Sequence, residues 1–185
     1  MAQICVYLGS RQGEDPRFID DTRMFGRRLA ERGHGLVYGG ASVGLMGALA
    51  NAALDAGGQV VGVMPHHLVD RELAHTGLSE LIRVADMHER KAQMAASADA
   101  FVMLPGGIGT LEEFFETWTW HYLGLHAKPI GILDSCQFYR PLLDFLEAGV
   151  AQGFLDARTL QTLVTAATPD ELLDQLEQRL AHLPG

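Results

Sequence analysis

The sequence is poor in cysteine and in long apolar runs, and both shortages exclude classes of protein. Among its 185 residues only Cys5 and Cys136 are cysteines, and they do not form a CxxC pair, so a disulfide framework is not expected. No apolar stretch reaches the length of a membrane span. The first residues lack a basic segment followed by a long apolar core, as a secretory signal would have. We therefore expect a cytoplasmic protein that does not insert into a membrane.

Positive charge is scarce as well. The chain has 14 lysines and arginines against 23 acidic residues, a formal net charge of −9, and its only lysines are Lys91 and Lys128. An acidic chain of this kind is a poor candidate for binding nucleic acid or an anionic membrane. It can still bind a single phosphate group, because a helix N-terminus and one or two well-placed cations do so locally.

Glycine, in contrast, is abundant, with 21 residues that cluster in short runs between apolar stretches. A short apolar run, a glycine turn and a helical pattern follow one another along the whole chain. This order predicts an α/β fold with a doubly wound, mostly parallel sheet and helices on both faces. The length fits one domain over residues 1–185. Strands are expected at 4–8, 35–38, 59–64, 81–84, 100–104, 129–133 and 163–164, and helices at 16–32, 43–56, 86–97, 110–123, 137–151 and from 168 onward.

Three glycine-bearing loops follow predicted strands, at 9–10, 39–47 and 105–110. In a doubly wound sheet such loops share the edge beyond the carboxyl ends of the strands, where ligands bind. In the third loop the missing side chains let backbone N–H groups approach an anion, and the following helix adds its positive dipole end. A tight strand-to-helix turn without a ligand is the alternative. The candidate phosphate contacts are Gly106, Gly107, Ile108, Gly109 and Thr110.

The loop at 39–47 is a second glycine-rich turn into a helix, but it is not a clean GxGxxG. The acidic residue that a dinucleotide site would place after the next strand is missing, because Val63–Pro65 stands there. A loop lying against a sugar or base fits better, whereas Gly47 alone fits close helix–sheet packing equally well. The further candidate nucleotide contacts are Gly9, Ser10, Gly39, Gly40, Gly44 and Met46.

Glu113 has two interpretations that the local pattern does not separate. Thr110 and Glu113 have the S/T-x-x-E spacing of a capping box, in which the glutamate caps its own helix. The same spacing places a carboxylate one turn from the proposed phosphate, where it could act in catalysis. Arg90 and Lys91 are similarly ambiguous: they belong either to a solvated helix face or to a ligand site, since cations near a first turn oppose the helix dipole.

The histidines do not form a recognisable metal motif. His66 and His67 are adjacent, and His121 and His126 are five residues apart, so neither pair matches HExxH or another usual ligand spacing. The nucleophile elbow G-x-S-x-G and the Walker A motif are also missing from the sequence. We therefore predict no metal site.

Two segments together carry a resemblance to a known family. Residues 87–91, Met-His-Glu-Arg-Lys, followed by residues 105–113, Pro-Gly-Gly-Ile-Gly-Thr-Leu-Glu-Glu, resemble the LONELY GUY (LOG) family, whose motif is PGGxGTxxE with an upstream arginine in an HERK-like segment. The segments 38–47, 62–65 and 123–129 are similar to this family too, so the resemblance covers nearly the whole chain. These proteins are cytokinin riboside 5′-monophosphate phosphoribohydrolases, long mislabelled as lysine decarboxylases.

The resemblance implies hydrolysis of the N-glycosidic bond of a nucleoside 5′-monophosphate, AMP or an N6-substituted relative, to a free base and ribose 5-phosphate. It assigns the catalytic pair to Arg90 and Glu113 and the phosphate loop to residues 106–110. It also implies a Rossmann-like fold, a homodimer, and no metal or organic cofactor. Position 108 departs from plant-type members, which commonly carry an aromatic residue where this chain has Ile108.

Two other functions are open at the level of sequence. One is a non-catalytic carrier of a nucleotide or cofactor on the same fold, which would bind its ligand without turnover. The other is a different enzyme on this scaffold, such as a decarboxylase that uses pyridoxal phosphate, although neither lysine stands in a recognisable context for that cofactor.

Overall fold

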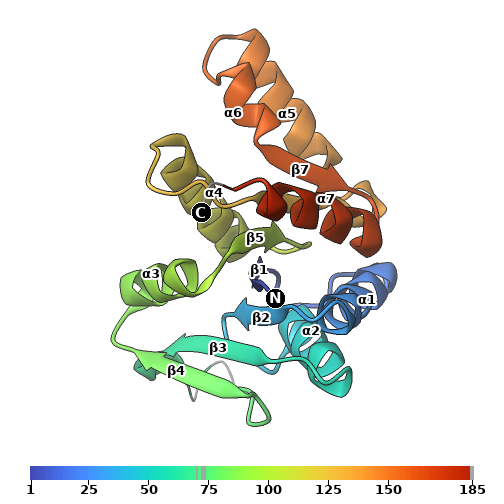
Figure 1. The fold of residues 1–185 in the computed structure, drawn as a ribbon, viewed down its shortest axis with the longest axis vertical. Coiled ribbons are helices and arrows are strands. Elements are labelled where there is room, and N and C mark those ends of the chain that lie inside the picture. Colours follow the sequence, from blue (N-terminus) through green and yellow to red (C-terminus); the bar gives the residue numbers. More distant parts are fainter. Residues whose placement is uncertain (70, 72–73, 184–185) are drawn as a thin grey trace.

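The chain folds around a seven-stranded parallel sheet (Figure 1). The computed structural model describes residues 1–69, 71 and 74–183. The sheet has the order β4-β3-β2-β1-β5-β6-β7, and each neighbouring pair of strands is parallel. The predicted doubly wound α/β fold is therefore confirmed. The strands are β1 (Gln3–Tyr7), β2 (Gly35–Tyr38), β3 (Val60–Pro65), β4 (Glu80–Val84), β5 (Ala100–Met103), β6 (Ile130–Leu133) and β7 (Leu163–Ala166).

Helices cover both faces of the sheet (Figure 1). Apolar side chains of α1, α2 and α7 belong to one core layer, and those of α3, α4 and α5 belong to the other. The helices are α1 (Arg17–Glu31), α2 (Gly44–Asp55), α3 (Met87–Ser97), α4 (Ile108–Tyr122), α5 (Arg140–Ala151), α6 (Ala157–Gln161) and α7 (Pro169–Ala181), with short 3₁₀ turns η1 (His66–Leu68) and η2 (Ser135–Gln137).

The strand order reverses between β1 and β5. The chain builds outward from β1 through β2 and β3 to β4, and then returns to form β5 on the other side of β1. The loops that follow β1 and β5 therefore separate to opposite faces, and they leave a crevice beyond the carboxyl ends of these two strands. Such a topological switch point is where ligands bind in open α/β sheets.

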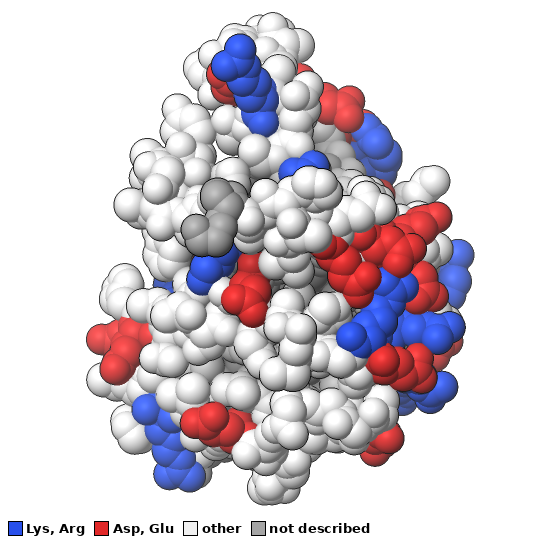
Figure 2. Space-filling model, viewed as in Figure 1, with Lys and Arg blue, Asp and Glu red and all other residues white. Residues whose placement is uncertain are grey.

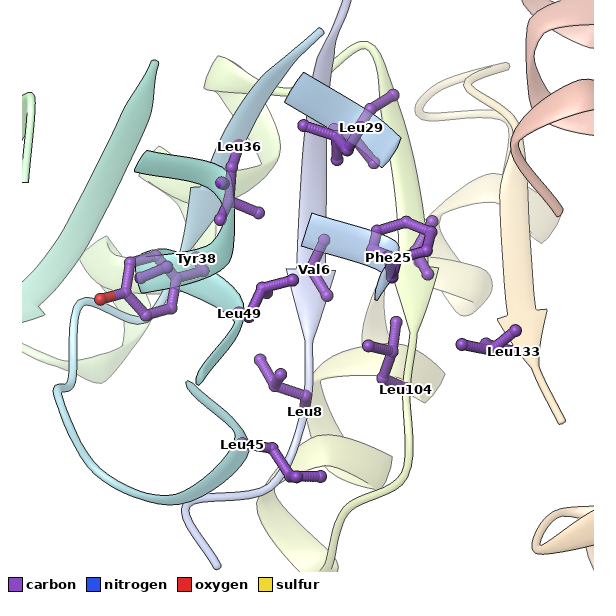
Figure 3. Close-up of a cluster of buried hydrophobic side chains, with 14 of the residues drawn as sticks. Val6, Leu8, Phe25, Leu29, Leu36, Tyr38, Leu45, Leu49, Leu104 and Leu133 are labelled. Carbon is purple, nitrogen blue, oxygen red and sulfur yellow. The ribbon is translucent and has the colours of Figure 1, made fainter. Parts of the chain in front are cut away.

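Strand β1 is continuously apolar from Ile4 to Tyr7 because both of its faces are buried. Ile4 and Val6 point into the core layer under α1 and α2, whereas Cys5 and Tyr7 point into the opposite layer. Figure 3 shows Val6 in the first of these layers, where it lies among leucine and phenylalanine side chains of the neighbouring helices and strands. A strand that is buried on both faces has no polar alternation, and each fully buried side chain of this size contributes about 1.5–3 kcal/mol.

Element boundaries differ from the prediction in two places that matter for the site. The helix expected from residue 110 begins at Ile108, and the helix expected from residue 137 begins at Arg140. The second difference arises because Cys136 and Gln137 have left-handed backbone conformations, which interrupt a helix. The short helix α6 was not predicted. The segment 66–79 lacks clear periodicity in the sequence, which predicts an irregular excursion or a short helix; it contains η1 and lies partly outside the described residues.

A band of ion pairs links α1 to α7 on the face shown in Figure 2, where red and blue side chains gather over these helices. Arg32 contacts Asp170 at 3.0 Å, Asp174 at 2.6 Å and Glu177 at 3.4 Å. Exposed pairs of this kind contribute little individually, but these three join one guanidinium to three carboxylates of α7. No helix in the described part of the chain is long and apolar enough to cross a membrane.

Candidate active site

A cavity of about 590 Å³ lies at the switch point, beyond the carboxyl ends of β1, β2 and β5. The loop after β1, the first turns of α2, α3 and α4, and the turn after β6 all contribute to its wall. It is lined by Val6, Leu8, Gly9, Ser10, Arg11, Gln12, Gly13, Phe18, Gly39, Leu45, Met46, Met87, Arg90, Pro105, Gly106, Gly107, Ile108, Gly109, Thr110, Glu112, Glu113 and Phe138. The residues we expected at the phosphate, from Gly106 to Thr110, all lie in this wall.

The loop from Pro105 to the start of α4 presents backbone rather than side chains to the cavity. Gly107 is the N-cap of α4 and makes no side-chain capping hydrogen bond, and the N–H of Leu111 donates the first helical bond to its carbonyl at 3.1 Å. In contrast, α3 is capped by Asp86, whose carboxylate accepts from the Glu89 N–H at 2.9 Å. The first turn of α4 thus keeps N–H groups that a bound anion can use.

The glycines of this loop fall into two groups. A Cβ on Gly106 would collide with the Thr110 side chain and lie 2.8 Å from the Gly9 backbone nitrogen, so close packing of two loops excludes any side chain there. A Cβ on Gly107 or Gly109 would meet no atom within 4 Å. Packing therefore does not require those two glycines, and their bare backbone is what faces the open cavity.

Glu113 is not part of a capping box. Thr110 is the third residue of α4 and is buried, so it cannot be the N-cap, and Glu113 lies in the second turn of the helix. Because Gly107 rather than Thr110 begins the helix, the capping interpretation of the S/T-x-x-E spacing is wrong. The structure places Glu113 in the cavity wall together with Arg90.

Arg90 is buried, with 5 % of its surface exposed, although it is only the fourth residue of α3. Its Nε donates to the Val63 carbonyl at 3.0 Å and its Nη2 to the Gly39 carbonyl at 2.7 Å. These carbonyls lie near the ends of β3 and β2, so the guanidinium is fixed against the sheet edge. The alternative of a solvated helix face is therefore wrong for Arg90. Gly39 is glycine because a Cβ there would collide with this guanidinium.

The negative charge of Glu113 acts on a buried polar pair at the end of β1. Burial raises the pKa of the Tyr7 hydroxyl well above its ordinary value, and electrostatic interaction with Cys5 and Glu113 raises it further. Tyr7 shares a hydrogen bond of 2.8 Å with Thr117, one helical turn after Glu113 on α4. Glu113 therefore lies between an open cavity and an uncharged, hydrogen-bonded floor.

Three of the expected nucleotide contacts lie elsewhere. Lys91 pairs with Glu112 at 2.5 Å and with Glu116 at 2.8 Å, so it ties α3 to α4 and does not line the cavity. Gly40 and Gly44 are also outside the lining, and both have a positive φ. The remaining expected contacts Gly9, Ser10, Gly39 and Met46 lie in the wall.

Sequence reasoning missed part of the wall. Arg11, Gln12 and Gly13 directly extend the Gly9–Ser10 loop, so the glycine turn itself could have indicated them. Phe18 reaches the cavity from α1, and Phe138 reaches it from the turn after β6. Their rings pack edge to face, with the ring centroids 5.4 Å apart. Nothing in the local sequence around Phe138 indicates that position. Within the described residues, no group of three or more His, Cys, Asp or Glu side chains could hold a metal ion.

Comparison with known sequences gives a consistent set of relatives. The family described as "possible lysine decarboxylase" matches residues 46–176. A probable cytokinin riboside 5′-monophosphate phosphoribohydrolase (LOGL1) of Oryza sativa subsp. japonica is 47% identical over 95% of this chain and 79% of its own length. A cytokinin riboside 5′-monophosphate phosphoribohydrolase (LOG4) of Arabidopsis thaliana is 45% identical over 95% of this chain and 82% of its own length.

Solved structures share the fold over nearly the whole chain. The protein TM1055 superposes with a TM-score of 0.72 and 26% identity, covering 96% of this chain and 99% of its own. The Moco carrier protein of Chlamydomonas reinhardtii superposes with a TM-score of 0.74 and 21% identity, covering 98% of this chain and 99% of its own. At 21% identity, the similarity to the Moco carrier protein shows a shared fold only.

Proposed function

The chain belongs to the LONELY GUY (LOG) family of phosphoribohydrolases within the "possible lysine decarboxylase" family, and on this premise we propose what it does. It hydrolyses the N-glycosidic bond of a nucleoside 5′-monophosphate to a free base and ribose 5-phosphate. The substrate is AMP or an N6-substituted adenosine monophosphate of the cytokinin type. Residues 1–185 act as one nucleotide-binding domain.

The observation that carries this proposal is the composition of one cavity wall. An uncapped helix N-terminus with bare glycines, a buried arginine and a glutamate line the same space at the switch point. The first of these is suited to a phosphate. Arg90 and Glu113 are suited to a reacting centre at C1′, which lies across the ribose ring from the 5′-phosphate.

We assign the phosphate to the loop of residues 106–110. The backbone N–H groups at the start of α4 and the Thr110 hydroxyl receive the 5′-phosphate, and the loop at Gly9 closes over it. Binding of the phosphate fixes the ribose relative to Glu113, so that binding energy from a non-reacting group orients the reacting bond.

We assign the chemistry to Glu113 and Arg90. Departure of the base leaves positive charge on the ribose ring, and an ionised carboxylate beside C1′ stabilises that charge. The same carboxylate orients water and accepts its proton as the oxygen bonds to C1′, while the base leaves with the bonding electrons and is protonated from solvent. Arg90 is held by two carbonyl groups and supplies a fixed positive charge that favours the ionised form of Glu113 and contacts the nucleotide.

The lysine geometry does not fit a decarboxylase that uses pyridoxal phosphate. Such an enzyme needs a lysine amine at the cofactor. Lys91 is engaged by two glutamates, and the Lys128 ammonium donates to the Ala95 carbonyl at 2.8 Å. Neither lysine lines the cavity. A carrier would use the same phosphate loop, but it has no need for a glutamate and a buried arginine at the sugar.

We also propose that the enzyme is a cytoplasmic homodimer. A second hollow, of about 640 Å³, lies between α4, α5 and α6 and is lined largely by aromatic and aliphatic side chains. At its rim Tyr122, Phe145 and Phe154 are 63%, 72% and 92% exposed. Exposed aromatic patches of this kind mark association surfaces, and a two-fold pairing of copies would cover it. The free thiols of Cys5 and Cys136 suit a reducing compartment.

A substrate panel tests the proposed activity. The purified protein is incubated with AMP, N6-isopentenyladenosine monophosphate, GMP, CMP and adenosine, and released base is measured by chromatography. We expect adenine-type bases from the two adenine nucleotides and at least 100-fold less from adenosine, because adenosine lacks the phosphate that orients it. Tight binding of AMP without release of adenine would instead identify a carrier.

A further inference from the structure

The turn after β6 has a strained backbone that is held by side-chain contacts. Cys136 and Gln137 have φ values of 56° and 58°, and they are the only non-glycine residues with positive φ in the described part of the chain. The Tyr139 N–H donates to the Asp134 carboxylate at 2.7 Å, and the Ser135 hydroxyl donates to Asp21 on α1. A conformation of this kind persists only where its surroundings determine it, and it is often found at functional sites.

The turn delivers two consecutive aromatic residues to the cavity region. Phe138 lines the cavity itself. Tyr139 lies beneath the phosphate loop, with 3 % of its surface exposed, and its hydroxyl donates to the Leu104 carbonyl at 2.8 Å. Leu104 directly precedes Pro105, whose carbonyl accepts from the Gly9 N–H at 3.1 Å. Tyr139 therefore contacts the backbone at the point where the phosphate loop begins.

The same hydroxyl keeps its proton. Burial raises the pKa of Tyr139 far above its ordinary value, so the hydroxyl stays neutral and can donate to the Leu104 carbonyl. The N–H groups of the loop that follows Leu104 are left to face the cavity.

A role in core packing alone would need the ring and not the hydroxyl. Tyr139 packs among apolar residues between α5 and the sheet, where phenylalanine would fill the same space apart from one oxygen atom. A buried hydroxyl is favourable only when it is hydrogen-bonded, and this one is bonded to the loop rather than to its own helix. The ring of Tyr139 therefore fills the core, whereas its hydroxyl serves to bond the backbone at the start of the loop.

We propose that Tyr139 is a positioning residue for the phosphate loop: its hydroxyl bonds the Leu104 carbonyl, where the loop begins, and holds the loop ready for the 5′-phosphate before the ligand arrives. This inference rests on the proposed function, which supplies the nucleotide. A loop that is already ordered loses less conformational freedom on binding, so its affinity for the phosphate group is higher.

The test compares Tyr139→Phe with Tyr38→Phe. Tyr38 is also fully buried, and its hydroxyl donates to the Ala41 carbonyl at 3.0 Å, away from the phosphate loop. Affinity is measured by calorimetry for ribose 5-phosphate, which carries the phosphate but has no N-glycosidic bond, and for adenosine, which lacks the phosphate. We expect Tyr139→Phe to weaken ribose 5-phosphate binding about five- to tenfold and to leave adenosine binding unchanged. Tyr38→Phe, whose lost hydroxyl bonds the 39–47 loop instead, should not weaken ribose 5-phosphate binding selectively over adenosine binding.

The kinetic expectation has the same form, with a raised KM for AMP and a kcat close to wild type. Equal weakening of both ligands, or unchanged ribose 5-phosphate binding, would overturn the proposal. Amide hydrogen exchange of the ligand-free protein gives a second measurement. We expect the amides of residues 106–110 to exchange faster in Tyr139→Phe than in the wild type, whereas equal exchange rates would contradict the positioning role. If AMP is not cleaved but Tyr139→Phe still weakens ribose 5-phosphate binding, the proposed activity fails and the positioning role stands.

Discussion

Two hollows of similar size lie along the same helix, α4, and they differ in nearly every chemical respect. The cavity at its N-terminus, about 590 Å³, is walled by glycine backbone, a buried arginine and a glutamate. The groove along its later turns, about 640 Å³, is walled by exposed aromatic rings. The first offers N–H donors and fixed charge, which stabilise a transition state, whereas the second offers apolar area, which stabilises association.

The difference teaches that volume does not identify the reacting site. The groove is slightly larger, yet apolar rings supply no group that could hold a phosphate or move a proton. In the cavity the buried guanidinium of Arg90 and the carboxylate of Glu113 lie where the sheet topology places a ligand. The substitutions below test whether the polar cavity alone cleaves AMP and the apolar groove alone supports association. They are ordered by their expected effect on AMP cleavage.

Glu113→Gln should have the largest effect. The amide has nearly the shape of the carboxylate but neither stabilises positive charge on the ribose nor accepts a proton from water. We expect kcat for AMP to fall about 1,000-fold or more, with AMP affinity within about threefold of wild type. Glu116→Gln is the matched control, because Glu116 lies one turn away and pairs with Lys91. A folded Glu113→Gln protein with wild-type turnover would refute the assignment.

Arg90→Lys should reduce kcat/KM for AMP about 100-fold. A single ammonium cannot reach both the Val63 and Gly39 carbonyls that the guanidinium now bonds, so the charge loses its fixed position. Initial rates over a range of AMP concentrations measure the loss. Arg83→Lys on β4 is the control, since Arg83 is exposed and outside the cavity. Comparable activity in the Arg90 and Arg83 variants would mean that the buried position of Arg90 is not used.

Two glycine substitutions in the phosphate loop should separate ligand binding from packing. Gly109→Ala has open space for its methyl group, so we expect unchanged thermal stability but a KM for AMP raised about tenfold by the methyl group near the phosphate. Gly106→Ala forces the loop away from Thr110 and should lower the stability of the protein by about 1–3 kcal/mol. Thermal melts and steady-state kinetics of both variants check this. Equal KM values in wild type and Gly109→Ala would place the phosphate elsewhere.

Phe145→Asp should have the smallest effect on cleavage and the largest on assembly. A carboxylate at this position would be buried without a partner in an apolar interface, which disfavours association. Light scattering after gel filtration should show a shift from dimer to monomer, whereas Met24→Asp, at an exposed apolar position on α1, should leave the dimer intact. A wild-type protein that is monomeric at micromolar concentration would remove the groove from the account.

The sequence sufficed for the fold and for the glycine turn between β5 and α4, because both follow from local patterns. The buried strands are apolar runs in the sequence. The glycines after β5 predict an anion-binding loop wherever α4 begins. The role of Glu113 could not be decided locally, since a glycine N-cap has no side-chain signature and Thr110 mimics one. The structure excludes the capping interpretation, because it places Thr110 inside the helix.

Other parts of the site depend on contacts between distant segments. The pairing of Lys91 with Glu112 and Glu116 follows from the packing of α3 against α4, which no local spacing reports. Phe138 and Tyr139 reach the loop through a turn of left-handed residues that are not glycines, so the usual signal for such a turn is missing. The packing of segments that are distant in the sequence determines where these side chains lie, and local composition does not report it.

The account's central claim is that the polar cavity cleaves the bond between base and sugar. The most direct measurement is a time course with AMP in which adenine, ribose 5-phosphate, adenosine and inorganic phosphate are all quantified. We predict that adenine and ribose 5-phosphate form in a one-to-one ratio as AMP disappears. Adenosine with inorganic phosphate, or AMP recovered unchanged from a tight complex, would contradict the claim.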